Sequence, residues 1–455
     1  MERNRLNKFD VIVVGAGTGG SLTSKTLANA GLKVCMIDRK EEKNIGDKVC
    51  GDAIGKHHFD NIGIAHPSGA ELDQVIEGIK VYSPDLETEV NVKGEGVHGY
   101  LVNRLLFGQR LVKEAKESGV TLMDQTVVVD PIIENGYVVG VTAKNLKTNE
   151  KMNLSAKAVV DASGHSAVLR KKLPAEFGIE NEVKGEDIEI CYREIREIKE
   201  PIDDPGFCKI YLDLKKVPGG YYWVFPKSPT TINVGLGVAM KEGFTNPKDL
   251  YDKVISDMPL FNDSKVLTGG GGLVPTRSPI SPMVGNGIII IGDAACQVNP
   301  IHGGGIGSSM MGGVKAAEVI IEALKKGDVS KEQMWPYTGM FMAAYGAKQA
   351  GLDLFRLLLQ SLNNEEMNYG MSHHLITDDD LLKASMGEDL KLNITEKTSR
   401  LFKGLGCVSL LMKLNSTAKL MKEVKQLYKN YPDSPAGLAD WQSKVDQVFE
   451  KAKNL

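Results

Sequence analysis

The stretch FDVIVVGAGTGGSLTSKTLANAGLKVCMID, residues 9–38, decides the fold. Its run of four β-branched residues predicts a strand that is buried on both faces. The strand ends in Gly15-Ala16-Gly17-Thr18-Gly19-Gly20, which matches the pattern G-x-G-x-x-G and leads into a helical stretch closed by Gly31. A second apolar strand then stops at Asp38. Strand, glycine turn, helix, strand and acid, in this order and over about 20 residues, favour a dinucleotide site over a merely structural turn.

Each glycine of this turn has its own expected role. Gly15 makes the tight turn, Gly17 lets a pyrophosphate approach the backbone, and Gly20 lets the helix pack on the strand. The pyrophosphate would then lie against the free N–H groups at the helix N-terminus. Asp38 would accept hydrogen bonds from ribose hydroxyls.

Length and composition limit the classes of function. A chain of 455 residues with 42% hydrophobic residues can bury a large core, and we expect two or three domains. The net charge of −3 argues against nucleic acid as the main partner. No leader-like segment opens the chain and no apolar run reaches about 18 residues, so we expect a cytoplasmic protein, or one attached peripherally to the inner membrane face. The six cysteines have no zinc-type spacing, so no metal site is expected.

A second glycine turn follows an apolar strand at 287–291. It begins with Gly292-Asp293 and continues to Gly305, Ile306 and a helix. A carboxylate at a strand end, ahead of a glycine-rich helix start, suits hydroxyl recognition and an anion at the helix dipole. Two such turns exceed what a nicotinamide site requires, and the strand meander at 120–160 favours the FAD-type variant of the fold.

The composition changes at residues 185–275, which are rich in β-branched and aromatic residues. This composition predicts an antiparallel sheet. Within them Tyr221, Trp223 and Phe225 recur at period two, which places them on one sheet face. That face is either an ordinary sheet core or an apolar wall for a substrate or a cofactor ring.

These motifs, in this order, resemble the FAD-dependent geranylgeranyl reductases of the archaeal lipid type, within the p-hydroxybenzoate-hydroxylase-like flavoprotein superfamily. The two glycine turns mark only the superfamily. The more specific signs are Tyr221-x-Trp223-x-Phe225-Pro226-x8-Gly235-x-Gly237, the Cys50-Gly51 loop, and the ending Tyr431-Pro432-Asp433-Ser434-Pro435. The resemblance covers nearly the whole chain. It implies an α/β fold with an FAD-binding Rossmann-like domain of the glutathione-reductase/p-hydroxybenzoate-hydroxylase type, an antiparallel β-sheet substrate domain and a helical C-terminal region.

The domain boundaries predicted on this basis divide the chain into three parts. Residues 1–180 and 280–340 form the FAD-binding domain, with residues of about 65–100 contributing to the substrate domain. Residues 181–279 form the antiparallel-sheet catalytic domain, and residues 341–455 form the helical C-terminal domain.

The resemblance also implies, by position, the residues that bind FAD: Gly15, Ala16, Gly17, Gly20, Asp38, Cys50, Gly51, Ala53, Arg104, Val128, Asp293, Gly305 and Ile306. Ala16, Asp38 and Val128 would contact the adenosine half. Arg104, which by position alone could equally be a solvated first-turn arginine, would reach the pyrophosphate side. Asp293 would bind the ribityl chain, with Gly305 and Ile306 against the isoalloxazine.

The implied activity is saturation of C=C bonds in geranylgeranyl chains, either as geranylgeranyl diphosphate or on glycerophospholipids, in membrane lipid biosynthesis. NAD(P)H or ferredoxin would supply the electrons. The substrate would contact Tyr221, Trp223, Phe225, Pro226, Gly235 and Gly237. The proton donor stays open between Cys50, His302 and a flavin-bound water. The alternatives are an FAD monooxygenase of the aromatic hydroxylase type and a non-enzymatic prenyl-binding carrier. The stretch 161–170 lacks the spacing of the second hydroxylase motif, which weakens the first of these.

Two further features of the sequence, a pair of cysteines and a basic segment, each allow two interpretations. In the implied fold Cys50 and Cys296 converge on the isoalloxazine end of FAD, where they form either a disulfide or two unrelated thiols. Residues 397–429 hold eight Lys/Arg against one acid, Glu423. This segment is either a solvated helix face or a contact with anionic lipid. In the second case the neighbouring apolar residues would take part, namely Leu401, Phe402, Leu405, Leu410, Leu411, Met412 and Leu414.

Overall fold

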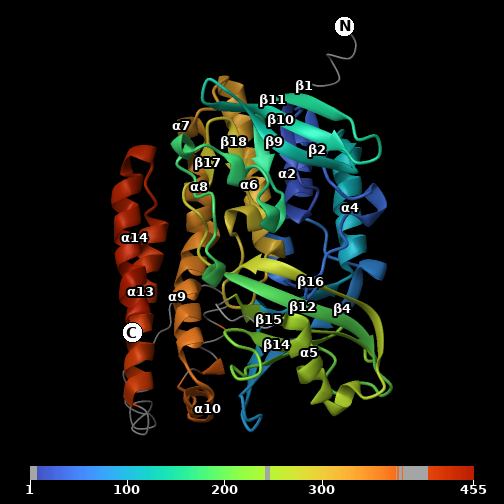
Figure 1. The fold of residues 1–455 in the computed structure, drawn as a ribbon, viewed down its shortest axis with the longest axis vertical. Helices are drawn as coiled ribbons and strands as arrows, with labels where there is room; N and C mark the ends of the chain where they lie inside the picture. Colours follow the sequence, from blue (N-terminus) through green and yellow to red (C-terminus); the bar gives the residue numbers. More distant parts are fainter. Residues whose placement is uncertain (1–7, 241–245, 376, 379–381, 383–407) are drawn as a thin grey trace.

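The computed structural model describes residues 8–240, 246–375, 377–378, 382 and 408–455. Two sheets follow one another along the long axis of the molecule, and C-terminal helices run along one side of both (Figure 1).

The first sheet is mainly parallel. Its parallel strands lie in the order β18-β11-β1-β2-β8, and β17 pairs antiparallel with β18 at the edge. β9 and β10 form an antiparallel meander on the first half of β11. The bounds are β1 (Lys8–Val14), β2 (Val34–Ile37), β8 (Thr121–Met123), β9 (Thr126–Glu134), β10 (Tyr137–Asn145), β11 (Lys151–Asp161), β17 (Val284–Gly285) and β18 (Ile288–Ile290).

Helices α2 (Thr18–Asn29), α4 (Arg104–Glu117) and α6 (Ile306–Lys326) pack on this sheet (Figure 1). The first turns of α2 and α6 meet, since the hydroxyls of Thr18 and Ser309 lie 3.0 Å apart. A Cβ on Gly313 would lie 2.5 Å from the carbonyl oxygen of Gly19, so glycine permits this close helix contact. The N-termini of α2 and α6 therefore lie next to each other, just beyond the carboxyl ends of β1 and β18.

The second sheet has the strand order β16-β12-β15-β14-β13-β5-β6. The strands within residues 185–275 pair antiparallel, as expected from sequence, and β6 pairs antiparallel with β5. Only the pair of β13 with β5 is parallel. The bounds are β5 (Gly78–Tyr82), β6 (Glu89–Lys93), β12 (Ile188–Glu197), β13 (Phe207–Tyr211), β14 (Tyr221–Pro226), β15 (Thr231–Ala239) and β16 (Lys265–Pro275).

The two faces of this sheet have different neighbours. Tyr222 and Val224 point to the outer face, into a cluster covered by α5 (Pro247–Ser256). Trp223 and Phe225 point to the inner face, against Leu101 of a small third sheet. That sheet consists of β3 (Ala53–Gly55), β7 (Gly99–Val102) and β4 (Leu72–Ile76), and helix α3 (Lys56–Ile62) follows β3.

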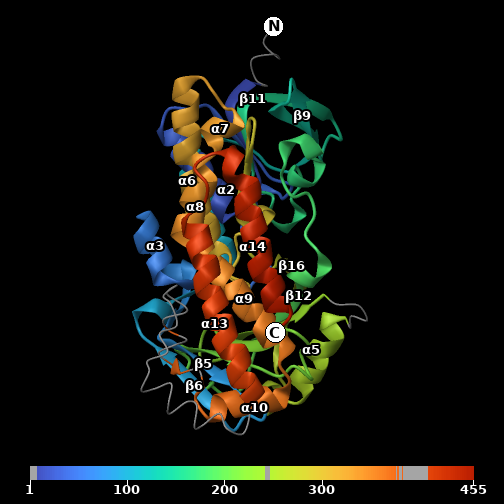
Figure 2. The ribbon, with the colours of Figure 1, turned by 90° about the vertical axis from the view of Figure 1, so that its left-hand side faces the viewer.

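The C-terminal helices form a layer beside both sheets (Figure 2). A π-helical turn at Met342–Gly346 joins α8 to α9, and α13 packs between α9 and α14. The tail signature has a structural role here, because the indole N–H of Trp335 donates to the carbonyl of Pro432 at 2.7 Å. The bounds are α7 (Lys331–Met334), α8 (Pro336–Phe341), α9 (Ala347–Ser361), α10 (Asn364–Ser372), α13 (Val408–Lys429) and α14 (Leu438–Lys453).

Helix α13 corrects part of the lipid-contact hypothesis. Leu410 is 1% exposed and Leu414 packs on the main core, because both face the rest of the molecule. Lys413 is paired with Glu366 at 3.4 Å and Lys425 is buried. Leu411 is half-buried, while Met412 is 66% exposed. Leu401, Phe402 and Leu405 lie outside the described residues. No helix in the described part of the chain is long and apolar enough to cross a bilayer.

Candidate functional site

The first glycine turn has the conformation that close approach of a phosphate requires. Gly15 has φ +104°, and a Cβ on it would lie 2.3 Å from the carbonyl oxygen of Ala162. A Cβ on Gly20 would lie 1.9 Å from the oxygen of Gly15, so helix and strand pack through glycine. Gly17 has no neighbour within 4 Å of its Cβ position and precedes α2 without a side-chain cap. The N-terminal amides of α2 can therefore receive an anion.

Asp38 stands at the carboxyl end of β2, beside this turn. Its carboxylate accepts from the backbone N–H of Ala16 at 2.9 Å and from that of Lys40 at 2.8 Å. The carbonyl of Asp38 accepts from Thr126, two residues before the buried Val128. The structure thus brings Ala16, Asp38 and Val128 together, as an adenosine-binding end requires.

Arg104 begins α4 and contributes a second group suited to an anion. Its Nε and Nη1 atoms are buried and have no hydrogen-bond partner among the described residues. Its guanidinium lies 6.0 Å from the ring centroid of Phe107. Buried charged donors without a partner are costly, and a pyrophosphate would satisfy them. These unpaired donors are the feature of the structure that matches the pyrophosphate of FAD.

The second glycine turn lies at the N-terminus of α6. Gly305 precedes that helix without a side-chain cap, and a Cβ on it would lie 3.1 Å from Oδ1 of Asp293. Oδ2 of Asp293 pairs with Nζ of Lys48 at 2.9 Å, and this carboxylate raises the pKa of Lys48. Ile306 packs into the cluster around Phe59 and Phe107. A carboxylate beside an uncapped helix start suits the ribityl chain and the polar edge of a flavin.

The inner face of the second sheet meets this turn through Tyr221. Its hydroxyl donates to the carbonyl of His302 at 2.9 Å, and Val274 of β16 lies 3.7 Å from the Cβ position of Gly303. Tyr221, Trp223 and Phe225 form a continuous row, with ring centroids 6.0 Å apart at each step. The aromatic face therefore points toward the loop where the isoalloxazine is expected. By the same alternation Pro226, at the end of β14, lies on the other face.

The Cys50-Gly51 loop approaches the same face at its other end. Gly51 is close to Phe225, since a Cβ on Gly51 would lie 3.2 Å from that ring. Ala53 begins β3 and packs against the cluster that contains Trp223 and Phe225. The loop of residues 49–52 and the loop of residues 300–305 thus bracket the inner face of β12, β14, β15 and β16.

Asn233 fixes the Cys50-Gly51 loop to the sheet, and sequence analysis did not predict it. Its amide nitrogen donates to the carbonyl of Cys50 at 2.8 Å and to the carboxylate of Asp52 at 2.9 Å. Its amide oxygen accepts from the indole N–H of Trp223 at 3.0 Å. Nζ of Lys227 lies 2.8 Å from carboxylate oxygens of both Asp52 and Asp73. Period-two spacing with Gly235 and Gly237 was the signal that could have identified Asn233.

Two glycines of β15 allow neighbouring side chains to pack directly against this strand between the two loops. A Cβ on Gly235 would lie 2.4 Å from Cζ2 of Trp223 and 2.5 Å from Cβ of Arg193. A Cβ on Gly237 would lie 3.2 Å from both Sγ of Cys191 and Oε2 of Glu189. Cys191, Gly237 and Tyr221 form one cross-strand row, because Gly237 pairs with the other two. Glu189, Cys191 and Arg193 were not predicted, since their strand has no motif.

Of the two alternatives for Cys50 and Cys296, a disulfide or two separate thiols, the structure has the second. Cys50 and Cys296 are both free thiols. Cys296 is completely buried behind Asp293, and its carbonyl accepts from the Gln349 side chain at 2.5 Å. Cys50 is half-buried and lies in the loop that Asn233 binds. The two segments converge on one end of the site, but their side chains point to different surroundings.

Burial controls the protonation of the groups here. It lowers the pKa of His302 to about 4, with a further contribution from Lys348, so the imidazole is neutral at neutral pH. Its Nδ1 accepts from the backbone N–H of Gly304 at 3.1 Å. Burial also raises the pKa of the Tyr221 hydroxyl, and nearby Glu189 contributes to that shift. His302 is therefore poorly suited to deliver a proton.

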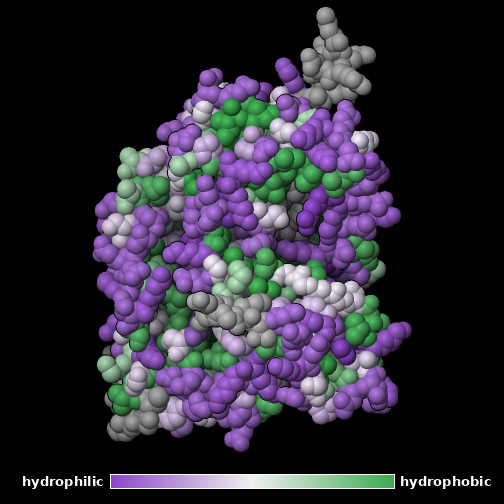
Figure 3. Space-filling model, in the orientation of Figure 1, coloured by the Kyte–Doolittle hydropathy of each residue, from purple (hydrophilic) through white to green (hydrophobic). Residues whose placement is uncertain are grey.

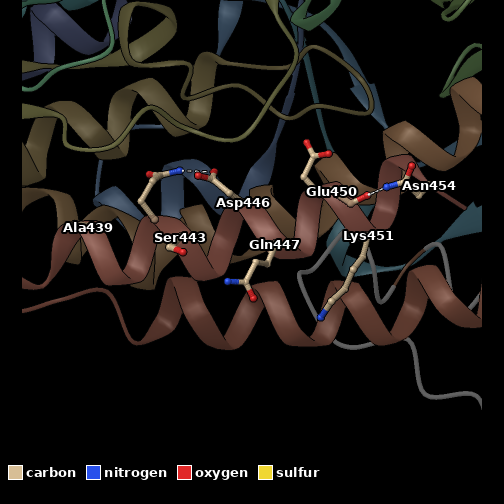
Figure 4. A pocket seen from close by; sticks show the side chains of 8 residues that line it. Ala439, Ser443, Asp446, Gln447, Glu450, Lys451 and Asn454 are labelled. Atoms are coloured by element: carbon tan, nitrogen blue, oxygen red, sulfur yellow. Dashed lines mark hydrogen bonds between the residues drawn. The ribbon is translucent and has the colours of Figure 1, made fainter.

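Other surface features lie away from this arrangement. An open hollow along α14 is lined by polar residues such as Gln442, Asp446 and Glu450, on the outer helical layer (Figure 4). Apolar and neutral residues cross the middle of the face in Figure 3, where Figure 1 places β16. The described residues contain no group of three or more side chains arranged to bind a metal ion.

Comparisons with known proteins agree with this geometry. A geranylgeranyl reductase catalytic domain model matches residues 187–274, and an FAD binding domain model matches residues 8–216. The chain is 44% identical over 443 residues to digeranylgeranylglycerophospholipid reductase of Sulfolobus acidocaldarius, covering 97% of each protein. It is 33% identical over 394 residues to the protein of that name from Methanothrix thermoacetophila, covering 85% of this chain and 96% of that one.

Among solved structures, a geranylgeranyl bacteriochlorophyll reductase-like protein from Thermoplasma acidophilum superposes with a TM-score of 0.77 at 24% identity, covering 90% of this chain and 99% of that one. This likeness shows that the two proteins share a fold. The catalytic-domain match coincides with β12 to β16, the strands of the second sheet that face the two loops.

Proposed function

Because the chain belongs to the digeranylgeranylglycerophospholipid reductase family, we propose that it reduces C=C bonds of geranylgeranyl chains in membrane lipid biosynthesis. The chain carries an FAD-binding domain, and FAD is its redox cofactor. The observation that carries the proposal is the hydrogen bond from Tyr221 to His302, which brings the aromatic face of β14 to the second glycine turn.

FAD supplies the hydride when it is bound in its reduced form. Arg104 and the N-terminus of α2 would bind its pyrophosphate, and Asp38 would bind the ribose. Asp293 and Gly305 would bind the ribityl chain and the flavin edge.

The aromatic row would position the alkene. An isolated trisubstituted double bond has no carbonyl that could be polarised, so positive charge develops at its tertiary carbon. The faces of Tyr221, Trp223 and Phe225 tolerate such charge and exclude water. Because Gly235 and Gly237 carry no side chain, Trp223 lies directly against β15 at the first and Cys191 and Glu189 do so at the second, which fixes the side chains that the substrate would meet.

The test is anaerobic turnover of a geranylgeranyl glycerophospholipid and of geranylgeranyl diphosphate by dithionite-reduced protein. We expect product masses that rise by pairs of hydrogen atoms. Oxygen consumption coupled to hydroxylation of an aromatic substrate would instead show a monooxygenase. A purified protein that contains no flavin and binds prenyl chains unchanged would show a carrier.

An external donor must deliver two electrons for each bond that is saturated. Both glycine turns are assigned to FAD, so NAD(P)H or ferredoxin would dock outside them. Anaerobic mixing of the oxidised holoprotein with NADPH, NADH or reduced ferredoxin distinguishes these donors by the rate at which the flavin absorbance is lost.

We also propose weak, salt-sensitive attachment to anionic membranes. Lys419, Lys422 and Lys429 are exposed on α13, and each cation near such a surface contributes about 1 kcal/mol. Liposome flotation should weaken when these three are changed to Gln, and Lys444→Gln on α14 is the control. Flotation that is equal at low and high salt would count against the proposal.

A further inference from the structure

We propose that Glu189 is the catalytic acid that protonates the alkene, a role that rests on the proposed function and extends it. Glu189 lies near the start of β12, on the inner face of the second sheet. Neither Cys50 nor His302, the donors considered from sequence, is required for this step.

Glu189 is buried where a charged carboxylate has little support. The residue is 5% exposed, and no hydrogen bond or ion pair joins its carboxyl to another described residue. Its two carboxyl oxygens are not among the fully buried polar atoms, so they border the open space on the inner face of the sheet. Other buried acids of the same region are bonded: Glu194 accepts from Tyr251 at 3.0 Å, and Asp52 accepts from Asn233 at 2.9 Å. A buried carboxyl without partners favours its neutral, proton-carrying form.

The neighbours of Glu189 place it beside the expected reaction centre. Its Oε2 lies 3.2 Å from the Cβ position of Gly237, so the carboxyl packs directly against the strand where this glycine has no side chain. Gly237 pairs with Cys191 on one side and with Tyr221 on the other. Tyr221 bonds to the carbonyl of His302, three residues before Gly305. The carboxyl therefore faces the stretch between the aromatic row and the flavin loop.

The charged and titratable groups around Glu189 are few. On its own strand the nearest is Cys191, on β14 it is Tyr221, and on α9 it is Arg356. Its partners in register on β15 and β16 are Ala239 and Val274, which do not titrate. Burial raises the pKa of Glu189 to about 7, against an opposing effect of Arg356, which is itself paired with Asp353 at 2.8 Å. Much of the carboxyl thus carries a proton at neutral pH.

The step balances in atoms and charge. The O–H bond of Glu189 breaks, and the proton joins the less substituted alkene carbon through the π electron pair. The tertiary carbon would receive the hydride from reduced FAD, which would be left oxidised, so each saturated bond uses the two electrons of one reduced flavin. Glu189 is left as a carboxylate and regains a proton from water before the next turnover.

The experiment uses reduced holoprotein, mixed anaerobically with a geranylgeranyl lipid in a single turnover. Return of the flavin absorbance and product mass are followed on both sides of the pKa of about 7. Because the neutral acid is required, the wild-type rate should fall as pH rises through this value. Glu189→Gln, which keeps the shape but has no acidic proton, should react at least about 100-fold more slowly and lose this pH dependence. Glu189→Asp should recover part of the rate.

Glu197→Gln is the matched control, because Glu197 lies on the same strand but is exposed. It should react as wild type does. Infrared spectra give a readout independent of turnover: the carbonyl band of a buried, protonated carboxylic acid should disappear in Glu189→Gln and remain in Glu197→Gln. If Glu189→Gln fails to fold, the pH profile and infrared band of Glu189→Asp decide the question.

Glu189→Gln that binds FAD and reacts within a few-fold of wild type overturns the inference. A Cys50→Ala variant that alone abolishes the pH-dependent limb also overturns it, since the thiol would then be the donor. Both results leave the proposed reductase activity intact, whereas wild-type protein that never saturates the lipid contradicts the proposed function itself.

Discussion

At the scale of single residues, buried polar atoms without a partner indicate where this chain can bind a charged ligand. Arg104 has two buried guanidinium nitrogens without a partner among the described residues. Arg110, on the following turn of the same helix, is paired with Glu71 at 2.9 Å and with Glu114 at 3.0 Å. The same residue type therefore stabilises the fold at one position and is expected to bind a ligand at the other.

Arg104→Met should weaken FAD binding by about 10- to 100-fold, since a charge-assisted hydrogen bond contributes about 1.5–3 kcal/mol. The melting temperature of the FAD-free protein should stay the same or rise, because an unpaired buried charge is removed. Arg110→Met should show the opposite pattern, with lower stability and unchanged FAD affinity. Titration of FAD into apoprotein and thermal unfolding measure both. A loss of apoprotein stability in Arg104→Met would assign that residue a structural role.

Asn233→Leu should lower the free energy of unfolding by about 3 kcal/mol or more. It leaves the Cys50 carbonyl and the Trp223 indole without their partner, and each buried unpaired group costs about 1–3 kcal/mol. It also removes one donor to the Asp52 carboxylate, which keeps its bond to Lys227. Urea denaturation measures the change, and alkylation of Cys50 should become faster as its loop loosens. Asn153→Ala, at an exposed position of β11, should change neither. Unfolding at the wild-type urea midpoint would show that the Asn233 contacts add nothing.

At the scale of elements, the glycines of β15 decide which side chains can pack against this strand. Gly235 touches Trp223 and Arg193, while Gly237 borders the space next to Glu189. On β16, Gly272 has no neighbour within 4 Å of its Cβ position. Glycine therefore relieves severe crowding at Gly235 and milder crowding at Gly237, whereas the Cβ position of Gly272 is open.

These differences predict unequal effects of adding one methyl group. Gly235→Ala should destabilise the protein by about 1–3 kcal/mol, because the Trp223 ring must move. Gly272→Ala adds a methyl group to open space and should change stability by less than about 0.5 kcal/mol. Denaturant midpoints of the two variants, compared under one condition, check the difference. Equal midpoints would mean that the Trp223 ring is not constrained by Gly235.

The features that could be predicted from sequence are those whose signal is contained in a short stretch of neighbouring residues. The turn at Gly15–Gly20, Asp38 and the period-two aromatic row are of this kind, and Gly31 ends α2 with φ +83° as expected. Contacts between distant segments cannot be seen in a local pattern. The spacing of Asn233 from Gly235 and Gly237 marked its position but not its partners, and the strand that holds Glu189 has no motif, so neither residue was predicted. Asn233 contacts Cys50 across 183 positions of sequence.

At the scale of the whole molecule, two expectations depended on where segments point after folding. The convergence of Cys50 and Cys296 was inferred from fold alone, yet Cys296 turns into the core. Leu410 and Leu414 were grouped with exposed cations, yet the packing of α13 on α9 turns them inward. Sequence spacing fixes the order of elements, whereas the direction of a side chain depends on partners that only the assembled layers supply.

In the proposed reaction the alkene meets the flavin on the inner face of the second sheet, beside Gly237. A Cβ at Gly237 would already lie 3.2 Å from Glu189 and Cys191, so valine should fill this space without reaching the FAD-binding turns. The measurement is anaerobic reoxidation of reduced holoprotein by a geranylgeranyl lipid, comparing wild type with Gly237→Val. We predict that wild type regains its flavin absorbance with one double bond saturated per flavin, while Gly237→Val binds FAD normally and stays reduced. Reoxidation of Gly237→Val at the wild-type rate would contradict the account.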